Sequence, residues 1–415
     1  MRICIISDDY MPDSIKSAGR MMHELALEFR SQGHEVMVIT PAVGASRSWY
    51  TEEFEGIFVG RFKSGRIKNV SKPIRALNEM LLSSKAFRAG KETFKAKPAD
   101  VIVYYSPTIF FGELVARLKK LWGAKSFLIL RDIFPQWVVD HGMLSDRSPI
   151  IRLFRIFERI NYRAADVIGL QSPANLEYFK RYFPEPGART VLYNWSLPVN
   201  AKGTGQWRDR LGLQKKTIFF YGGNLGHAQD MGQILRLADA LQTEAQAHFL
   251  LVGAGDEVPL IQRYVQEAKV KNVTYLEAVS QGDFQVMMAE TDIGLFSLHR
   301  NHTTHNFPGK VLAYLAQGLP ILGAVNPGND IQTVISGADA GFVCESGDDQ
   351  ALLANAKALL DAGQRARMSR NASKLLKETF SVRSATRKIL SSIEQLDTNG
   401  DMGKRDDLEN GAPPL

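Results

Sequence analysis

The chain has 415 residues, enough for two or three domains, and its 45% hydrophobic and 23% charged residues are typical of a packed globular protein. No run of about 18 apolar residues appears, which excludes a helix that spans a bilayer. The net charge of +7 is uneven, because residues 1–200 hold 29 Lys and Arg against 20 Asp and Glu, whereas residues 201–415 hold 22 against 24.

The first residues lack the apolar length and small-residue cleavage site of a signal peptide, so we expect the protein to stay in the cytosol. Strand 2–7, an amphipathic helix over about 20–31 and strand 33–40 predict a βαβ opening. Gly19 in the loop before the helix would let the backbone approach a ligand at the carboxyl edge of the first strand.

After an irregular stretch over 45–70, the pattern predicts strand 101–104, helix 110–121 and strand 126–130. Arg131 and Asp132 leave this last strand at the edge where open α/β sheets bind ligands, so they are candidates for acceptor recognition and proton acceptance. An ion pair that holds the loop is an equally good interpretation.

Two basic segments contain many apolar residues. Residues 61–97 carry eleven basic and two acidic side chains, a mixture that suits a membrane or a nucleic acid. Residues 148–164 predict a basic amphipathic helix that lies either on a membrane or, as an ordinary surface helix, on the protein core.

Strand 167–170, helix 174–181 and strand 190–192 complete a first domain over 1–196, and small or flexible residues predict a linker over 197–206. A second α/β run follows over 207–380. It opens with strand 217–221 and a glycine-rich loop, 222–226, which can hold phosphates through backbone N–H groups. Helices are expected over 348–360, 364–378 and 381–395, and a disordered tail over 397–415.

A helix with marked ends begins near Phe307. Asn306 is its expected cap, Pro308 lies in its first turn and Gly318 closes it. The free N–H groups of the first turn and the Lys310 ammonium predict a site for a phosphate or diphosphate. The alternative is an ordinary capped helix with a solvated lysine.

These motifs, with Gly33–Thr40 and Leu251–Gly255, resemble those of the family 4 glycosyltransferases over nearly all of residues 1–395. The chain looks most like bacterial surface-polysaccharide transferases that add N-acetyl-L-fucosamine to a lipid-linked saccharide. The resemblance implies the GT-B fold, an α/β architecture with two Rossmann-like domains facing across a cleft, and a C-terminal helix, 381–396, that packs back toward the first domain.

The resemblance also implies a metal-independent, retaining transferase that uses a nucleotide-sugar donor such as a UDP-sugar and works at the inner face of the plasma membrane. Asp132 and His305 are then the catalytic candidates, and Arg131 is the acceptor ligand. The donor-binding candidates are Gly19, Arg20, Gly223, Asn224, Gln229, Asn306, Gly309 and Lys310.

The sequence departs from the family at four positions. The Glu-x7-Glu pair of the family is replaced by His305 and Ala313, so the ribose carboxylate is missing. Asn224 and Gln229 stand where the family has Arg and Lys, which leaves Lys310 as the clearest cation at the diphosphate.

Three other interpretations remain. His299, His302 and His305 have a spacing that can hold zinc, but no acid or cysteine lies among them, so we expect no metal cofactor. A nucleotide-sugar epimerase of the same fold would bind a similar donor. A nucleic-acid-binding protein would use the 61–97 segment, yet no recognised binding motif accompanies it, and we expect no nucleic-acid partner.

Overall fold

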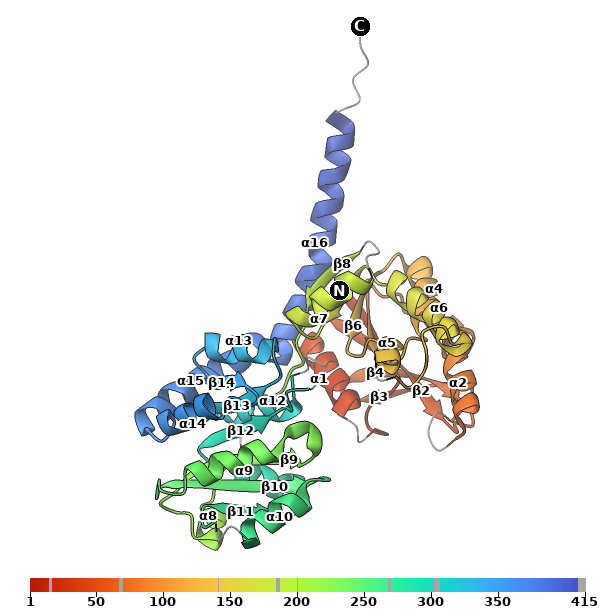
Figure 1. Ribbon diagram of the computed structural model, residues 1–415. Helices are drawn as coiled ribbons and strands as arrows, with labels where there is room; N and C mark the ends of the chain where they lie inside the picture. Colours follow the sequence, from red (N-terminus) through yellow and green to blue (C-terminus); the bar gives the residue numbers. More distant parts are fainter. Residues whose placement is uncertain are drawn as a thin grey trace. The chain divides into compact units, whose positions relative to one another are not determined.

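The computed structural model describes residues 1–14, 17–66, 70–140, 142–183, 187–199, 201–267, 270–301 and 307–409. The chain forms two compact units (Figure 1): unit 1 is Met1–Tyr193 with Ala385–Leu415, and unit 2 is Asn194–Ser384. Each unit contains a parallel sheet flanked by helices, so the predicted α/β architecture of two Rossmann-like domains is confirmed.

The predicted linker, 197–206, lies inside unit 2. The Val199 amide donates to the carbonyl of Ala316, and both the amide and the hydroxyl of Thr204 donate to the Glu290 carboxylate. These bonds attach the segment to unit 2, and the change of unit falls between Tyr193 and Asn194.

Unit 1 has an eight-stranded sheet in the order β3-β4-β2-β1-β5-β6-β7-β8, in which only the β3–β4 pair is antiparallel. The strands are β1 (Arg2–Ile6), β2 (Glu35–Val43), β3 (Trp49–Phe54), β4 (Ile57–Ser64), β5 (Val101–Ser106), β6 (Lys125–Leu130), β7 (Val167–Leu170) and β8 (Ala188–Val191). The helices are α1 (Ser17–Ser31), α2 (Lys72–Met80), α3 (Leu82–Ala96), α4 (Gly112–Trp122), α5 (Gln136–Asp140), α6 (Pro149–Arg163) and α7 (Pro173–Tyr182).

The expectation of an irregular stretch over 45–70 is wrong, because β3 and β4 form a hairpin there. Phe54 pairs with Ile57 across the two-residue turn Glu55-Gly56, and both turn residues have positive φ, 48° and 73°. Such turns match the twist of a hairpin. The half-exposed, charged β3 has no apolar run, which is why it was missed.

One core of unit 1 joins alternate strand residues to helices α3, α4, α6 and α7, through Phe94, Leu114, Tyr162 and Phe179. Helices α4 and α6 lie side by side on this face of the sheet (Figure 1). Gly112 of α4 makes this contact close, since a Cβ there would lie 2.5 Å from Cα of Asn161.

Unit 2 has a six-stranded, fully parallel sheet in the order β11-β10-β9-β12-β13-β14. The strands are β9 (Thr217–Asn224), β10 (Ala247–Ala254), β11 (Val273–Leu276), β12 (Ile293–Ser297), β13 (Ile321–Val325) and β14 (Gly341–Glu345). The helices are α8 (Gln206–Leu211), the short 3-10 helix η1 (His227–Gln229), α9 (Met231–Ala240), α10 (Val258–Glu267), α11 (Gln281–Ala289), α12 (Gly309–Gln317), α13 (Asp330–Gly337), α14 (Asp349–Ala358) and α15 (Ala362–Thr379).

The last helix, α16 (Val382–Glu409), begins in unit 2 and continues in unit 1. Its buried apolar residues, Val382, Ala385, Ile389 and Ile393, recur at helical spacing. The helix continues over 397–409, although the polar composition of 397–415, with Gly and Pro, predicted disorder. Within the described part of the chain, every helix is too short or too polar to span a membrane.

Candidate functional site

Both sheets have a point where the order of strands reverses. In unit 2 the central strand β9 has β10 on one side and β12 on the other, and in unit 1 strand β1 has β2 on one side and β5 on the other. Ligands of open α/β sheets bind outside the carboxyl ends of strands at such points. In unit 2 this edge carries the glycine-rich end of β9, together with α12, which follows β12.

Helix α12 begins at Gly309, with Pro308 as the N-cap residue at φ −62° and ψ 136°. The helix therefore begins two residues after the predicted start near Phe307. A residue that precedes proline is sterically disfavoured in helical geometry, which explains why Phe307 lies before the helix. Asn306 and His305 themselves lie outside the described residues.

Lys310 occupies the first turn of α12, and its ammonium is buried. The nitrogen lies 3.5 Å from the centroid of the Tyr221 ring, and it has no hydrogen-bond partner among the described residues. Burial lowers the pKa of Lys310 to about 7. A buried cation whose hydrogen-bonding capacity is unused favours an anion beside it.

Tyr314, one turn after Lys310, fixes α12 against the sheet. Its hydroxyl accepts from the amide of Gly222 at 3.0 Å and donates to the carbonyl of Leu295 at 3.1 Å. Gly294 leaves room for the Tyr314 ring, which a Cβ would meet at 2.4 Å. The first turn of α12 is thus held at the end of β9.

The end of β9 is shaped by Gly223, at φ 114°, a conformation that residues with side chains rarely adopt. A Cβ there would lie 4.0 Å from Cε of Lys310, so this backbone passes over the lysine. Asn224 then donates its side-chain amide to Gln229 at 2.6 Å. The two predicted donor residues therefore meet, and each is partly engaged with the other.

His299 lies beside η1, since its amide donates to the carbonyl of Ala228 and its ring centroid is 5.0 Å from that of His227. The other two histidines of the predicted zinc spacing, His302 and His305, lie outside the described residues. Elsewhere in the described chain, no three His, Cys, Asp or Glu side chains converge as a metal site.

In unit 1, Arg131 and Asp132 lie at the carboxyl end of β6. The buried Arg131 guanidinium donates to the carbonyl of Leu192 at 2.6 Å and to that of Tyr193 at 3.3 Å. It therefore ties β6 to the end of β8. Asp132 is exposed, but the protein around its carboxyl group partly desolvates it. This desolvation raises the pKa of Asp132, and the positive charge of Arg131 opposes the shift.

Tyr105 at the end of β5 belongs to the same edge. Burial raises its pKa to about 12, Arg131 opposes the shift, and the carboxylates of Asp132 and Asp8 add to it. The carboxyl ends of β1, β5 and β6 therefore bring Asp8, Tyr105, Arg131 and Asp132 into one electrostatic neighbourhood.

Gly19 lies inside α1, because that helix begins earlier than predicted, at Ser17. A Cβ on Gly19 would lie 3.0 Å from Ser14, so its close approach is to the protein's own loop. Arg20, the next residue, is exposed.

The loop after β1 is held by Arg61, whose side chain is 2% exposed. Arg61 binds Glu52 at 2.5 Å, Asp13 at 3.1 Å and the carbonyl of Met11 at 2.7 Å. Sequence reasoning missed Arg61, Tyr221 and Tyr314. Only Tyr314 leaves a signal, as a hydroxyl one turn after Lys310 on an otherwise apolar helix face.

Two family models match the chain. Residues 18–195 match the Glycosyl transferase 4-like domain, and residues 204–375 match the Glycosyl transferases group 1 domain. The two matches fall almost entirely in unit 1 and unit 2, respectively.

Relatives and solved structures agree with these matches. The chain is 24% identical over 63% of its length to a probable glycosyltransferase, WbjE, of Pseudomonas aeruginosa, covering 66% of that protein. It is 25% identical over 83% of its length to WcaI of Escherichia coli K12, a putative colanic acid biosynthesis glycosyl transferase, covering 86% of it. The Anabaena protein Alr3699/HepE, solved in complex with UDP, shares the fold with a TM-score of 0.65 at 17% identity, over 95% of this chain and 100% of that one.

Proposed function

We propose, from the premise that this chain belongs to family 4 of the glycosyltransferases, that it transfers a sugar from a nucleoside-diphosphate donor to a lipid-linked saccharide during bacterial surface-polysaccharide assembly. The observation that carries the proposal is the buried Lys310 ammonium beside the glycine-rich end of β9. A diphosphate there would supply the hydrogen-bond acceptors that the described residues do not.

The first task of the site is to stabilise the leaving diphosphate. In our proposal its oxygens accept from Lys310, from the first-turn amides of α12 and from the backbone at Gly223. Asn224 and Gln229 add amide donors in place of the family's two cations. This arrangement supplies positive charge without a metal ion, so we propose that transfer is metal-independent.

The second task is the acceptor. The C1–oxygen bond to the diphosphate breaks while the acceptor hydroxyl forms a bond to C1 on the same face, and its proton passes to the departing phosphate. Retention of configuration is part of this proposal. Asp132 holds the acceptor hydroxyl, because it is the exposed carboxylate of its edge, and Arg131 positions the loop that carries Asp132. His305 is proposed as a sugar contact.

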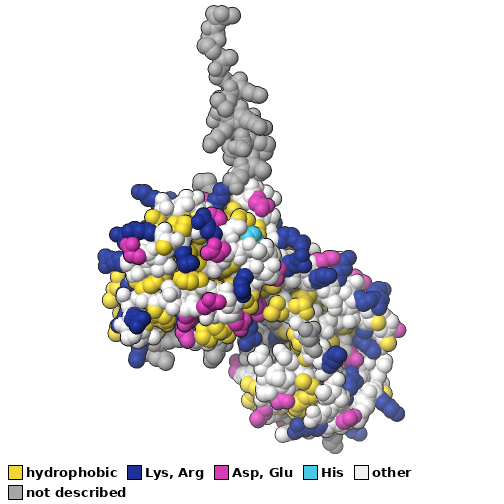
Figure 2. Space-filling view, turned by 180° about the vertical axis from the view of Figure 1, so that it is seen from behind, with side chains coloured by type: hydrophobic (Ala, Val, Ile, Leu, Met, Phe, Trp, Pro, Cys, Tyr) yellow, Lys and Arg dark blue, Asp and Glu magenta, His cyan; other side chains and the backbone are white. Residues whose placement is uncertain are grey.

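The acceptor is proposed to be a polyprenyl-linked saccharide met at the inner face of the plasma membrane. The name of WcaI, which assigns that protein to colanic acid biosynthesis, supports a saccharide acceptor. On the chain itself, α2 exposes Ile74 and Leu77 at 52% and 54%, and α6 exposes Ile150 and Ile156 at 52% and 54%. Figure 2 shows hydrophobic side chains open between Lys and Arg side chains on the face of unit 1 that it displays.

The donor is proposed to be a UDP-linked N-acetylated deoxyhexose such as N-acetyl-L-fucosamine. A panel of nucleotide sugars, incubated with a synthetic lipid-linked acceptor and read by mass spectrometry, tests the whole proposal. One sugar should add to the acceptor and release the nucleoside diphosphate. A nucleotide sugar that is isomerised without any acceptor would instead identify an epimerase.

A further inference from the structure

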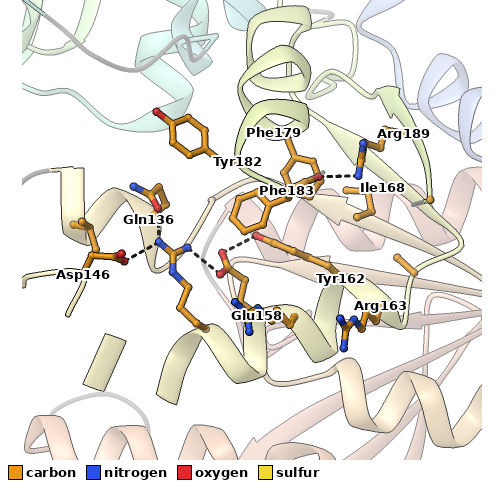
Figure 3. A pocket seen from close by; sticks show the side chains of 15 residues that line it. Gln136, Asp146, Glu158, Tyr162, Arg163, Ile168, Phe179, Tyr182, Phe183 and Arg189 are labelled. Carbon is orange, nitrogen blue, oxygen red and sulfur yellow. Dashed lines mark hydrogen bonds and ion pairs between the residues drawn. The ribbon is translucent and has the colours of Figure 1, made fainter. Parts of the chain in front are cut away.

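A pocket of about 800 Å³ lies in unit 1, and Asp132 does not line it. It is lined by α5, α6, β7, α7 and the start of β8 (Figure 3). None of the proposed donor or acceptor residues lines it.

Arginines from two elements line this pocket. Arg155, Arg159 and Arg163 follow one another at four-residue spacing on α6, and Arg189 comes from β8. Residues at that spacing share one helix face. Against these four cations the described lining holds two carboxylates, Asp146 and Glu158.

One arginine and the two carboxylates are joined by ion pairs along one wall. Arg155 binds Glu158 at 3.0 Å and Asp146 at 3.3 Å, and it also bonds the side chain of Gln136 (Figure 3). The hydroxyl of Tyr162 bonds Glu158 from the other side at 3.3 Å. Burial raises the pKa of Glu158 to about 7, so its negative charge is compensated or partly absent. Arg159, by contrast, is exposed and makes no ion pair with any described residue.

The opposite wall is aromatic. Phe179 and Phe183 stack with a centroid distance of 4.9 Å, and both meet the ring of Tyr162. Arg189 lies over Phe179 at 5.4 Å and donates to the carbonyl of Phe183. The pocket therefore combines a cationic rim with an apolar wall.

The neighbouring face of α6 is apolar and open to solvent. Ile150, Leu153, Ile156 and Ile160 are 52%, 42%, 54% and 39% exposed, although an isoleucine or leucine is usually buried. These four residues, the α6 stripe, run alongside the row of arginines on the same helix. Cations beside an exposed apolar stripe fit an amphiphile with an anionic head.

We propose that this pocket binds the diphosphate of the polyprenyl lipid that carries the acceptor saccharide, while the α6 stripe lies in the apolar layer of the membrane. The inference rests on the proposed function and deepens it by naming where the lipid part of the acceptor is held. A diphosphate is favoured over a phospholipid headgroup because several guanidinium groups suit an anion with several charges and many acceptor oxygens.

The test compares two charge reversals on α6. Arg159→Glu changes the pocket, whereas Arg152→Glu changes an exposed arginine of the same helix that does not line it. The full-length protein and both variants are sedimented with three kinds of vesicle. The two kinds that contain an anionic lipid have the same surface charge. These are phosphatidylcholine alone, phosphatidylcholine with phosphatidylglycerol, and phosphatidylcholine with undecaprenyl diphosphate.

The unchanged protein should bind the diphosphate vesicles most tightly. Arg159→Glu should weaken that binding at least about tenfold, the loss expected when one hydrogen bond to a charged group is removed, and Arg152→Glu should weaken it less. Equal binding to phosphatidylglycerol and diphosphate vesicles, or equal losses in the two variants, would overturn the proposal.

A calorimetric titration of the same preparations with UDP separates this inference from the proposed function. If the protein binds UDP but shows no preference for the diphosphate vesicles, only the proposed lipid site is rejected. If the unchanged protein does not bind UDP, the proposed transferase function itself is rejected.

Discussion

The ammonium of Lys310 lies 3.5 Å from the centroid of the Tyr221 ring. The face of an aromatic ring attracts a cation, but it accepts no conventional hydrogen bond, so it replaces only part of the water that burial removes. Because the charged amine is stabilised less than it would be in water, the pKa of this lysine is lowered to about 7. The ligand-free site is therefore electrostatically unsatisfied.

Lys310→Met should weaken UDP binding by ~1.5–3 kcal/mol, because a charged hydrogen-bond donor to the diphosphate is lost while the volume is nearly kept. Isothermal calorimetry measures the change. Lys215→Met is the matched control, since Lys215 is an exposed lysine of the same unit. If Lys310→Met binds UDP as the unchanged protein does, the diphosphate is held elsewhere.

The affinity for UDP should fall as pH rises from 7 to 9. In the ligand-free protein Lys310 loses its proton near pH 7, whereas a bound diphosphate favours the charged amine. Binding above pH 7 must therefore take up a proton, which titrations in two buffers of different ionisation enthalpy will detect. The uptake should vanish in Lys310→Met, and a pH-independent affinity would contradict the assignment.

The contribution of Lys310 to the stability of the folded protein should change with pH in the direction opposite to its contribution to UDP affinity. Its pKa is about 7 in the folded protein and near 10.4 when unfolded, so the unfolded chain binds more protons between these values. The contribution of Lys310 to the free energy of unfolding should therefore rise with pH from 7 to about 10. Thermal unfolding of the unchanged protein and Lys310→Met across this range measures the difference, and parallel curves would contradict it.

Tyr314→Phe should destabilise unit 2 by ~1–3 kcal/mol, because the amide of Gly222 and the carbonyl of Leu295 lose their shared partner in the interior. Denaturant unfolding gives the value. Tyr264→Phe is the control, since its hydroxyl donates to the carbonyl of Leu235, outside the site. UDP affinity should fall in Tyr314→Phe alone.

Asp132→Asn should lower the rate of sugar transfer by ~10–100-fold, the range for losing a charged hydrogen-bond acceptor of the hydroxyl, while leaving UDP affinity unchanged. Glu53→Gln removes an exposed carboxylate from the same unit and should leave transfer intact. Normal transfer by Asp132→Asn would assign the acceptor contact to another residue.

Transfer should continue after treatment with EDTA, because Lys310 and the first turn of α12 supply the positive charge for the leaving group. The assay compares initial rates before and after chelation. Activity that is lost and then restored by zinc or manganese would return attention to His299, His302 and His305.

The buried parallel strands were predictable because they read as continuous apolar runs between turn signals, as 101–104 and 217–221 do. The β3–β4 hairpin was not, since one of its strands is charged and half exposed. Its turn, Glu55-Gly56, is not among the pairs that usually mark a hairpin.

The candidate site was predictable only in part. The glycine-rich loop and the lysine of α12 stand out in the sequence, but the ring that faces Lys310 belongs to a different strand. Arg131 was recognised as notable, yet its partners are carbonyls 61 and 62 residues further along the chain. A pattern of local spacings contains no information on such distant contacts.

The buried guanidinium of Arg61 couples the loop after β1 to the hairpin, since it holds Met11 and Asp13 on one side and Glu52 on the other. The shape of that loop is therefore encoded some fifty positions downstream. Transplanting residues 7–14 alone into another α/β scaffold would leave their anchor behind. The loop and the hairpin depend on each other structurally, so a design that uses the loop must include the hairpin as well.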